Sequence, residues 1–134
     1  MIHTASFFEE WNFGSGRLVS IAIQAPDWFA VTYGERELEI CELLQPDWHL
    51  VNSYRAHLLS PDKYKKIYWD LLKERLKDNG FDFLNGYLGR EKTLELLGLQ
   101  DSDTLLCWEK HGKFCHRILV ADLLRKNGIE VVRK

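Results

Sequence analysis

Apolar residues in this chain gather first in short segments at residues 2–6, 17–23, 104–108 and 129–132, of which 17–23 is nearly continuous. Runs of this length and composition are typical of strands, and continuous ones indicate a sheet that is covered on both faces. The run at 17–23 stops short of Pro26, because proline cannot donate a hydrogen bond within a sheet. The sequence therefore predicts strands at these four places.

Between these runs, apolar residues recur at helical spacing. The strongest pattern covers residues 62–79, with Ser60 placed to cap the helix, Pro61 in its first turn and Gly80 after its end. Further helices are predicted at 91–97 and 115–127, each followed by a glycine, and weaker ones at 35–44 and 46–57. Residues 7–13 are rich in aromatic side chains and predict a turn or a short helix.

The last third of the chain reads as strand, helix and strand. A crossover of that length joins two parallel strands. We therefore expect a single α/β domain over residues 1–134, a small three-layer Rossmann-like fold with a mainly parallel sheet. No G-x-G-x-x-G motif and no phosphate-binding loop follows a predicted strand, so we expect no nucleotide cofactor.

Composition and charge narrow the classes of protein. The chain has 134 residues, of which 46% are hydrophobic, enough for a core without metal or disulfide bonds. A formal net charge of -2 argues against binding nucleic acid through bulk positive charge, although a local basic site is compatible with it. The amino terminus lacks a signal peptide and no window resembles a membrane span. With three cysteines, this pattern predicts a cytoplasmic protein with free thiols and no membrane partner.

Residue types that carry chemistry gather at the turn between residues 107 and 117. The periodicity of the last helix places His116 and Arg117 on its apolar arc, facing the crevice beyond the carboxyl end of the 104–108 strand. The helix amino terminus favours negative charge there, and Arg117 adds a planar fork suited to phosphate or carboxylate. With Lys113 nearby, the turn predicts a site for an anionic ligand, such as phosphate or a nucleotide.

Cys115 is predicted at the cap of this helix, where the dipole and neighbouring cations lower a thiol pKa. Cys115 or His116 is then a candidate nucleophile or general acid and base. Glu109 is a candidate to orient His116 or to pair with Arg117. The alternative is an inert capping cysteine beside a structural ion pair, and Cys107, in mid-strand, is predicted to be buried.

Two other features of the turn's surroundings bear on ligands. Cys107, His111, Cys115 and His116 are suitable metal donors, but their spacing matches no standard zinc pattern, so we expect no metal. Trp28 follows Pro26 at the end of the 17–23 strand and is a candidate for stacking on a flat ligand, with simple packing as the alternative. Trp108 is predicted to lie in the core.

The carboxyl-terminal part of the chain, residues 104–132, resembles the bacterial and phage family catalogued as domain of unknown function 488. The resemblance rests on Leu-Cys-Trp-Glu at 106–109, Phe-Cys-His-Arg at 114–117 and Leu-Val-Ala at 119–121, before a final strand. Many family members carry Asp-x-Arg at the end of the second strand, where this chain has Ala-Ile-Gln at 22–24. The resemblance implies a compact α/β domain with the Cys-His-Arg turn as its site, and it implies no established activity.

Two hypotheses follow from the sequence. In the first, the protein is a small enzyme for an anionic substrate, a nucleotide or a nucleic-acid component. Arg117 holds the anion, Cys115 or His116 is the nucleophile or the general acid and base, and Glu109 orients the histidine. In the second, it is a binding or interaction module in which these side chains form a satisfied structural network.

Overall fold

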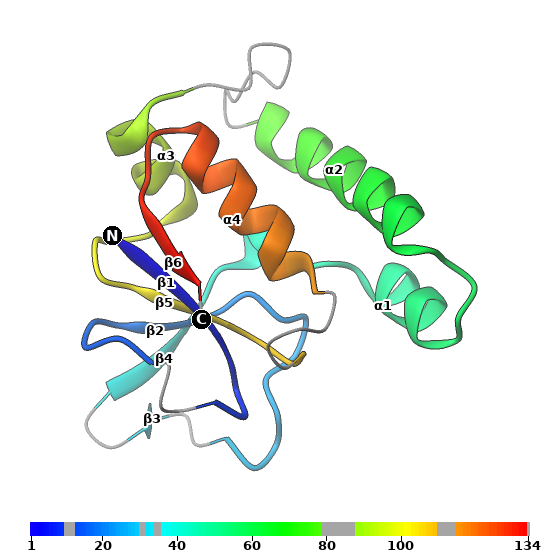
Figure 1. Ribbon diagram of the computed structural model, residues 1–134, viewed down its shortest axis with the longest axis horizontal. Coiled ribbons are helices and arrows are strands. Elements are labelled where there is room, and N and C mark those ends of the chain that lie inside the picture. Colours follow the sequence, from blue (N-terminus) through cyan, green and yellow to red (C-terminus); the bar gives the residue numbers. More distant parts are fainter. Residues whose placement is uncertain (10–12, 30–31, 34–35, 79–87, 110–114, 134) are drawn as a thin grey trace.

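The computed structural model describes residues 1–9, 13–29, 32–33, 36–78, 88–109 and 115–133 (Figure 1). Its strands are β1 (Ile2–Ser6), β2 (Leu18–Ser20), β3 (Thr32–Tyr33), β4 (Arg36–Ile40), β5 (Thr104–Cys107) and β6 (Val131–Arg133). Its helices are α1 (Trp48–Arg55), α2 (Pro61–Lys77), α3 (Arg90–Leu97) and α4 (His116–Lys126), with a 3-10 turn, η2 (Glu42–Leu44).

The strands form one sheet in the order β3-β4-β2-β5-β1-β6. The five strands from β4 to β6 run parallel, and only β3, at the edge, is antiparallel to its neighbour among the described strands. The register places Thr4, Leu105 and Val19 in one row across the sheet, and Ala5, Leu106 and Ser20 in the next row. The predicted fold class, a small Rossmann-like α/β domain with a mainly parallel sheet, is confirmed.

The two faces of the sheet are covered differently. Buried residues of η2 and of all four helices belong to one apolar cluster, which includes Val19 and Leu105 from the sheet (Figure 1). The opposite face, with Leu18 and Leu106, packs against aromatic residues of the connections after β1 and β2, among them Phe7 and Phe29. The expected third layer is thus built from loop residues in the described chain. Right-handed crossovers explain this division, because the connections after β1 and β2 run along the sheet in the opposite direction to those after β4 and β5.

The residues that the sequence predicts at helix ends have the predicted conformations and contacts. The Ser60 side chain accepts a hydrogen bond from the Lys63 N–H, and Pro61 begins α2. Gly98 and Gly128, which follow α3 and α4, have φ values of 67° and 80°, in the left-handed region that glycine adopts without strain. The predicted helices at 46–57, 62–79, 91–97 and 115–127 are therefore confirmed, with ends shifted by at most two residues.

The helix predicted at residues 35–44 is wrong. Residues 36–40 form β4, which pairs with β2, and only η2 is helical in the remainder of that segment. The cause is tertiary: a parallel neighbour for β2 offers backbone hydrogen bonds and a partly buried place for Leu38 against the aromatic face. The strand predicted at 17–23 is also shorter and ends at Ser20.

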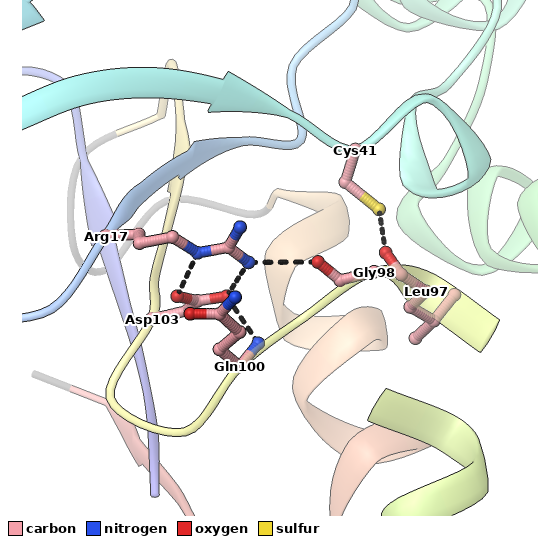
Figure 2. A network of polar contacts seen from close by, with 6 residues as sticks. All are labelled: Arg17, Cys41, Leu97, Gly98, Gln100 and Asp103. Carbon is pink, nitrogen blue, oxygen red and sulfur yellow. Dashed lines mark hydrogen bonds and ion pairs between the residues drawn. The ribbon is translucent and has the colours of Figure 1, made fainter. Parts of the chain in front are cut away.

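A network of hydrogen bonds around an ion pair lies at the end of the sheet where β2 and β5 begin (Figure 2). Asp103 is fully buried and accepts hydrogen bonds from Arg17 Nε at 2.9 Å and Arg17 Nη2 at 2.8 Å. The Gln100 N–H donates to the same carboxylate, and Arg17 Nη2 also donates to the Gly98 carbonyl. This network attaches the turn between α3 and β5 to the start of β2. It thereby fixes the position along β2 at which β5 begins.

Within the described part of the chain, no helix is long and apolar enough to cross a membrane.

Candidate functional site

The two cysteines of the turn meet at the carboxyl end of β5. Cys107 is the last residue of β5 and Cys115 is the N-cap residue of α4, and their sulfur atoms lie 2.7 Å apart. Both are buried, Cys107 completely and Cys115 to 5% exposure. The Cys115 side chain makes no capping hydrogen bond, so its sulfur faces Cys107 and His116 instead. The predicted burial of Cys107 and the predicted capping position of Cys115 are both observed.

The His116 ring is held in one orientation by the backbone of the sheet. Its Nε2 lies 2.7 Å from the Ile21 carbonyl, just past β2, and its Nδ1 lies 3.5 Å from Cys115 Sγ. Because a carbonyl only accepts, Nε2 carries a hydrogen and donates it to Ile21. Tyr68 packs against the ring edge to face, at 5.5 Å between centroids. The proton that Cys115 and His116 can exchange therefore lies between the Cys115 sulfur and His116 Nδ1.

The surroundings separate the pKa values of the two thiols. Burial by itself raises the pKa of Cys115, but the hydrogen bond with Cys107, the charge and ring N–H of His116 and the backbone N–H of Arg117 together lower that pKa well below its ordinary value. Burial and the neighbouring Cys115 raise the pKa of Cys107 well above its ordinary value. The two sulfurs share a hydrogen bond, and of the two thiols Cys115 is the one that ionises more readily.

Arg117 is buried at the same helix start. Its side chain is only 3% exposed, and its Nη1 has no hydrogen-bond partner among the described residues. The positive charge of Arg117 favours the ionised form of Cys107, the cysteine that does not line the pocket. A buried guanidinium nitrogen without a partner is uncommon.

A pocket of about 60 Å³ opens beside Cys115 and His116. Its walls are mostly apolar and aromatic, from Ile23, Pro46 and Val51 together with Tyr54, Tyr64 and Trp108. A larger hollow of about 560 Å³ adjoins it, and the two share Tyr54, Arg55 and Glu109. The two hollows form one groove. Cys115 lies in the smaller hollow, and the cation Arg55 and the carboxylate Glu109 lie where the two hollows meet.

The position of this pocket follows from the topology. β5 lies between β2 and β1, and α4, the helix that follows β5, packs on the helix face, whereas Phe7 and Phe29, which follow β1 and β2, pack on the aromatic face. Neighbouring strands whose connections separate in this way leave a crevice at their carboxyl ends, where ligands bind in open α/β sheets. The pocket lies beyond the carboxyl end of β5, where the sequence predicts a site.

Three of the candidate residues lie differently from expectation. Glu109 lines the pocket, but it neither orients His116, whose two ring nitrogens face Ile21 and Cys115, nor forms an ion pair with Arg117 in the described structure. Arg117 is not among the residues that line the pocket. The carbonyl of Ile21 takes over the role assigned to Glu109, because the crossing of α4 over the sheet brings the ring onto the backbone beyond β2.

Trp28 also lies away from the pocket. It is 58% exposed and packs against Phe8, with 5.3 Å between ring centroids, beside the aromatic cluster on the other face of the sheet. The aromatic residue that reaches the pocket is Trp108, which the sequence predicts in the core; its indole N–H donates to the Gln24 carbonyl at 2.6 Å. Lys113 falls outside the described residues.

Sequence reasoning missed the pocket residues that α1 and α2 contribute. Tyr54 and Arg55 end α1 and Tyr64 lies in the first turns of α2, about fifty residues before the cysteine pair in the chain. Nothing in their local pattern distinguishes them from an ordinary aromatic core and a solvated helix end. The packing of α1 on α2 and of α2 on α4 brings them to Cys115 (Figure 1).

Comparisons with family models, with curated proteins and with solved structures find no match to this chain.

Proposed function

We propose that this protein is a small cytoplasmic enzyme that acts on an anionic substrate through the Cys115 thiolate. The observation that carries the proposal is the arrangement of Cys115 Sγ, 3.5 Å from an imidazole nitrogen whose partner nitrogen is bound to the Ile21 carbonyl. A cysteine paired with an oriented histidine is the usual arrangement of an activated thiol nucleophile. Its position in a pocket, rather than in a sealed core, gives a substrate access to it.

The chemistry follows from the charges at the helix start. The thiolate attacks the electrophilic centre of the substrate, a phosphorus or a carbonyl carbon, and a bond from sulfur forms as the bond to the leaving group breaks. The leaving group takes a proton from solvent. The Glu109 carboxylate then accepts a proton from the water that attacks the sulfur-bound intermediate and releases the product, and the thiolate is restored. Negative charge that develops during attack is stabilised by the amino terminus of α4 and the buried Arg117.

The groove favours a planar substrate that carries the anionic group. Tyr54, Tyr64 and Trp108 offer aromatic surface for a flat ring, and exposed Arg55 offers a bidentate donor to phosphate or carboxylate. The adjoining hollow of about 560 Å³ is within the usual size range for small-molecule sites. A nucleotide or a nucleic-acid component combines both features, so we infer a phosphate ester of this kind as the substrate.

A structural role for the same residues is the alternative, and the burial of both cysteines favours it. A purely structural network is expected to satisfy its own polar groups. The unpartnered Nη1 of Arg117 counts against that expectation within the described residues.

Alkylation of the reduced protein tests the reactivity of Cys115. At about pH 6, where an ordinary thiol is almost entirely protonated, we expect iodoacetamide to label Cys115 in preference to Cys41 and Cys107. Peptide mass spectrometry identifies the labelled residue. His116→Gln removes the imidazole and should shift the labelling of Cys115 to higher pH. Labelling of all three thiols at equal rates, with an ordinary pH dependence, would exclude the nucleophile.

A burst assay tests the covalent step. p-Nitrophenyl phosphate, and p-nitrophenyl acetate for acyl chemistry, should release up to one equivalent of nitrophenol with formation of a Cys115 adduct in the intact mass. Cys115→Ser should abolish the burst, whereas Cys41→Ala should retain it, because Cys41 lies in the core beside Leu97. Wild-type protein that gives neither a burst nor an adduct with either ester refutes the proposal for these two reaction classes.

Thermal-shift measurements test the substrate class. Nucleoside monophosphates should stabilise the wild type, and Arg55→Ala, which removes the cation that lines the groove, should reduce that shift. Equal shifts in the wild type and this variant would exclude the groove as the anion site.

A further inference from the structure

The contact between the two sulfur atoms has a second consequence, which concerns oxidation. Cys107 and Cys115 are separated by eight positions in the chain, yet their sulfurs are 2.7 Å apart, and a disulfide bond requires about 2 Å. Both residues are held by regular elements, one at the end of β5 and one at the start of α4. Closing the remaining gap requires only a small movement of the two side chains.

The two thiols also differ in accessibility. Cys115 lines the pocket and therefore meets small molecules that enter from solvent, whereas Cys107 lies behind it and is fully buried. Cys115 is thus placed to meet an oxidant first and Cys107 to react with the product of that encounter. This is the division between an attacking and a resolving cysteine in thiol redox proteins.

We propose that Cys107 and Cys115 form a reversible intramolecular disulfide bond when the protein meets a hydroperoxide. The inference shares with the proposed function only the reactivity of the Cys115 thiol, and it holds whether or not the protein has a substrate of another kind.

The reaction balances in two steps. The Cys115 thiolate attacks the outer oxygen of the hydroperoxide, the O–O bond breaks, and with one proton the products are a sulfenic acid on Cys115 and an alcohol, or water from hydrogen peroxide. The Cys107 thiol then attacks the Cys115 sulfur, and the S–O bond breaks to release water as the Sγ–Sγ bond forms. In total, two thiols are oxidised by two electrons and the hydroperoxide is reduced. A small dithiol or thioredoxin-type reductant reverses the bond by exchange.

Cys41 provides the internal control. Its Sγ donates to the Leu97 carbonyl at 3.3 Å, and burial raises its pKa to about 11. It belongs to the part of the core near α3, away from the pocket residues. Cys41 is therefore expected to remain a thiol under conditions that oxidise the pair.

The experiment treats the reduced full-length protein with a small excess of hydrogen peroxide and follows the intact mass, with peptide mapping under non-reducing conditions. We expect the wild type and Cys41→Ala to lose two hydrogen atoms and to yield a cross-linked peptide containing residues 107 and 115. Dithiothreitol should restore the original mass. In Cys107→Ser, Cys115 should instead accumulate as sulfenic acid, trapped by dimedone, and proceed to sulfinic acid.

The wild-type measurement keeps the test decisive even where a variant folds poorly. If wild-type Cys115 gains oxygen atoms without a cross-link, or if both thiols survive peroxide that oxidises free glutathione, the proposal is overturned. The burst assay is performed on the fully reduced protein, so a cross-link without a burst would count against the proposed function alone. A burst without a cross-link would count against the disulfide alone.

Discussion

The two ends of β5 each carry a buried polar cluster with an arginine, and the clusters are built in opposite ways. At the amino end, the carboxylate of Asp103 accepts from Arg17 and from the Gln100 N–H, and Arg17 also donates to the Gly98 carbonyl (Figure 2). At the carboxyl end, Arg117 has a buried Nη1 without a partner among the described residues, next to two sulfurs in contact.

The difference shows how one strand can serve both architecture and chemistry. The Arg17 and Asp103 charges neutralise each other, so this cluster stabilises the fold and offers little to a ligand. The cysteine cluster contains a buried cation whose Nη1 has no partner among the described residues and a thiol whose pKa is lowered, and groups with shifted pKa values are typical of functional sites. The thiols near the two clusters also differ. The pKa of Cys41, near the first cluster, is raised, whereas in the second the pKa of Cys107 is raised and that of Cys115 is lowered.

Breaking the cluster around Arg17 and Asp103 should have the largest effect on stability. Asp103→Asn removes a buried carboxylate and leaves the Arg17 fork without its charged partner, so we expect a loss of about 3 kcal/mol in the free energy of unfolding. Urea denaturation measures it. Asp101→Asn is the matched control, since this carboxylate is 60% exposed and should contribute less than about 1 kcal/mol. Equal losses in the two variants would mean that the network does not fix the fold.

The raised pKa of Cys41 should make the protein less stable in alkali. The unfolded thiol ionises near 9.0, whereas burial holds the folded thiol protonated to about pH 11, so stability is complete below pH 9 and falls as pH rises toward 11. The full loss is about 3 kcal/mol for a two-unit shift. Unfolding of the reduced wild type and Cys41→Ala should show that the variant loses less stability over this range. A parallel decline in both proteins would contradict the assignment.

Cys115 should show the opposite dependence on pH. Because its folded pKa is lowered, its contribution is present above the ordinary pKa of 9.0 and is lost as pH falls through the folded value. The difference in unfolding free energy between the wild type and Cys115→Ser should therefore grow as pH rises toward 9. Guanidinium titrations of the reduced proteins at several pH values give this difference. A constant difference would place a neutral thiol at the helix cap.

Removing Arg117, the cation of the cysteine cluster, should have the smallest effect on stability. Arg117→Met keeps the apolar stem and deletes a buried charge whose Nη1 has no partner, so we expect a change below about 1 kcal/mol in either direction. The matched variant Arg17→Met leaves Asp103 buried without its partner and should lose about 3 kcal/mol. Similar large losses for both arginines would show that Arg117 is also a structural residue.

The site could be predicted only in part. Residue types and helical phasing place Cys115 at a helix start and turn His116 and Arg117 inward, because those properties depend on neighbours three or four positions away. The contact between Cys107 and Cys115 is a different matter. It depends on where α4 lies over the sheet, as does the pairing of His116 with Ile21, ninety-five positions earlier.

By itself, the sequence determined the elements with strong local signals. Alternating and continuous apolar runs specify β1 and β5, and Ser60, Pro61, Gly98 and Gly128 specify helix ends, since these are short-range effects of backbone geometry and burial. Tertiary structure decided the rest. It made a strand of residues 36–40, because β2 required a parallel neighbour, and it brought Tyr54, Arg55 and Tyr64 to Cys115, because a pocket is a property of packed elements and has no period along the chain.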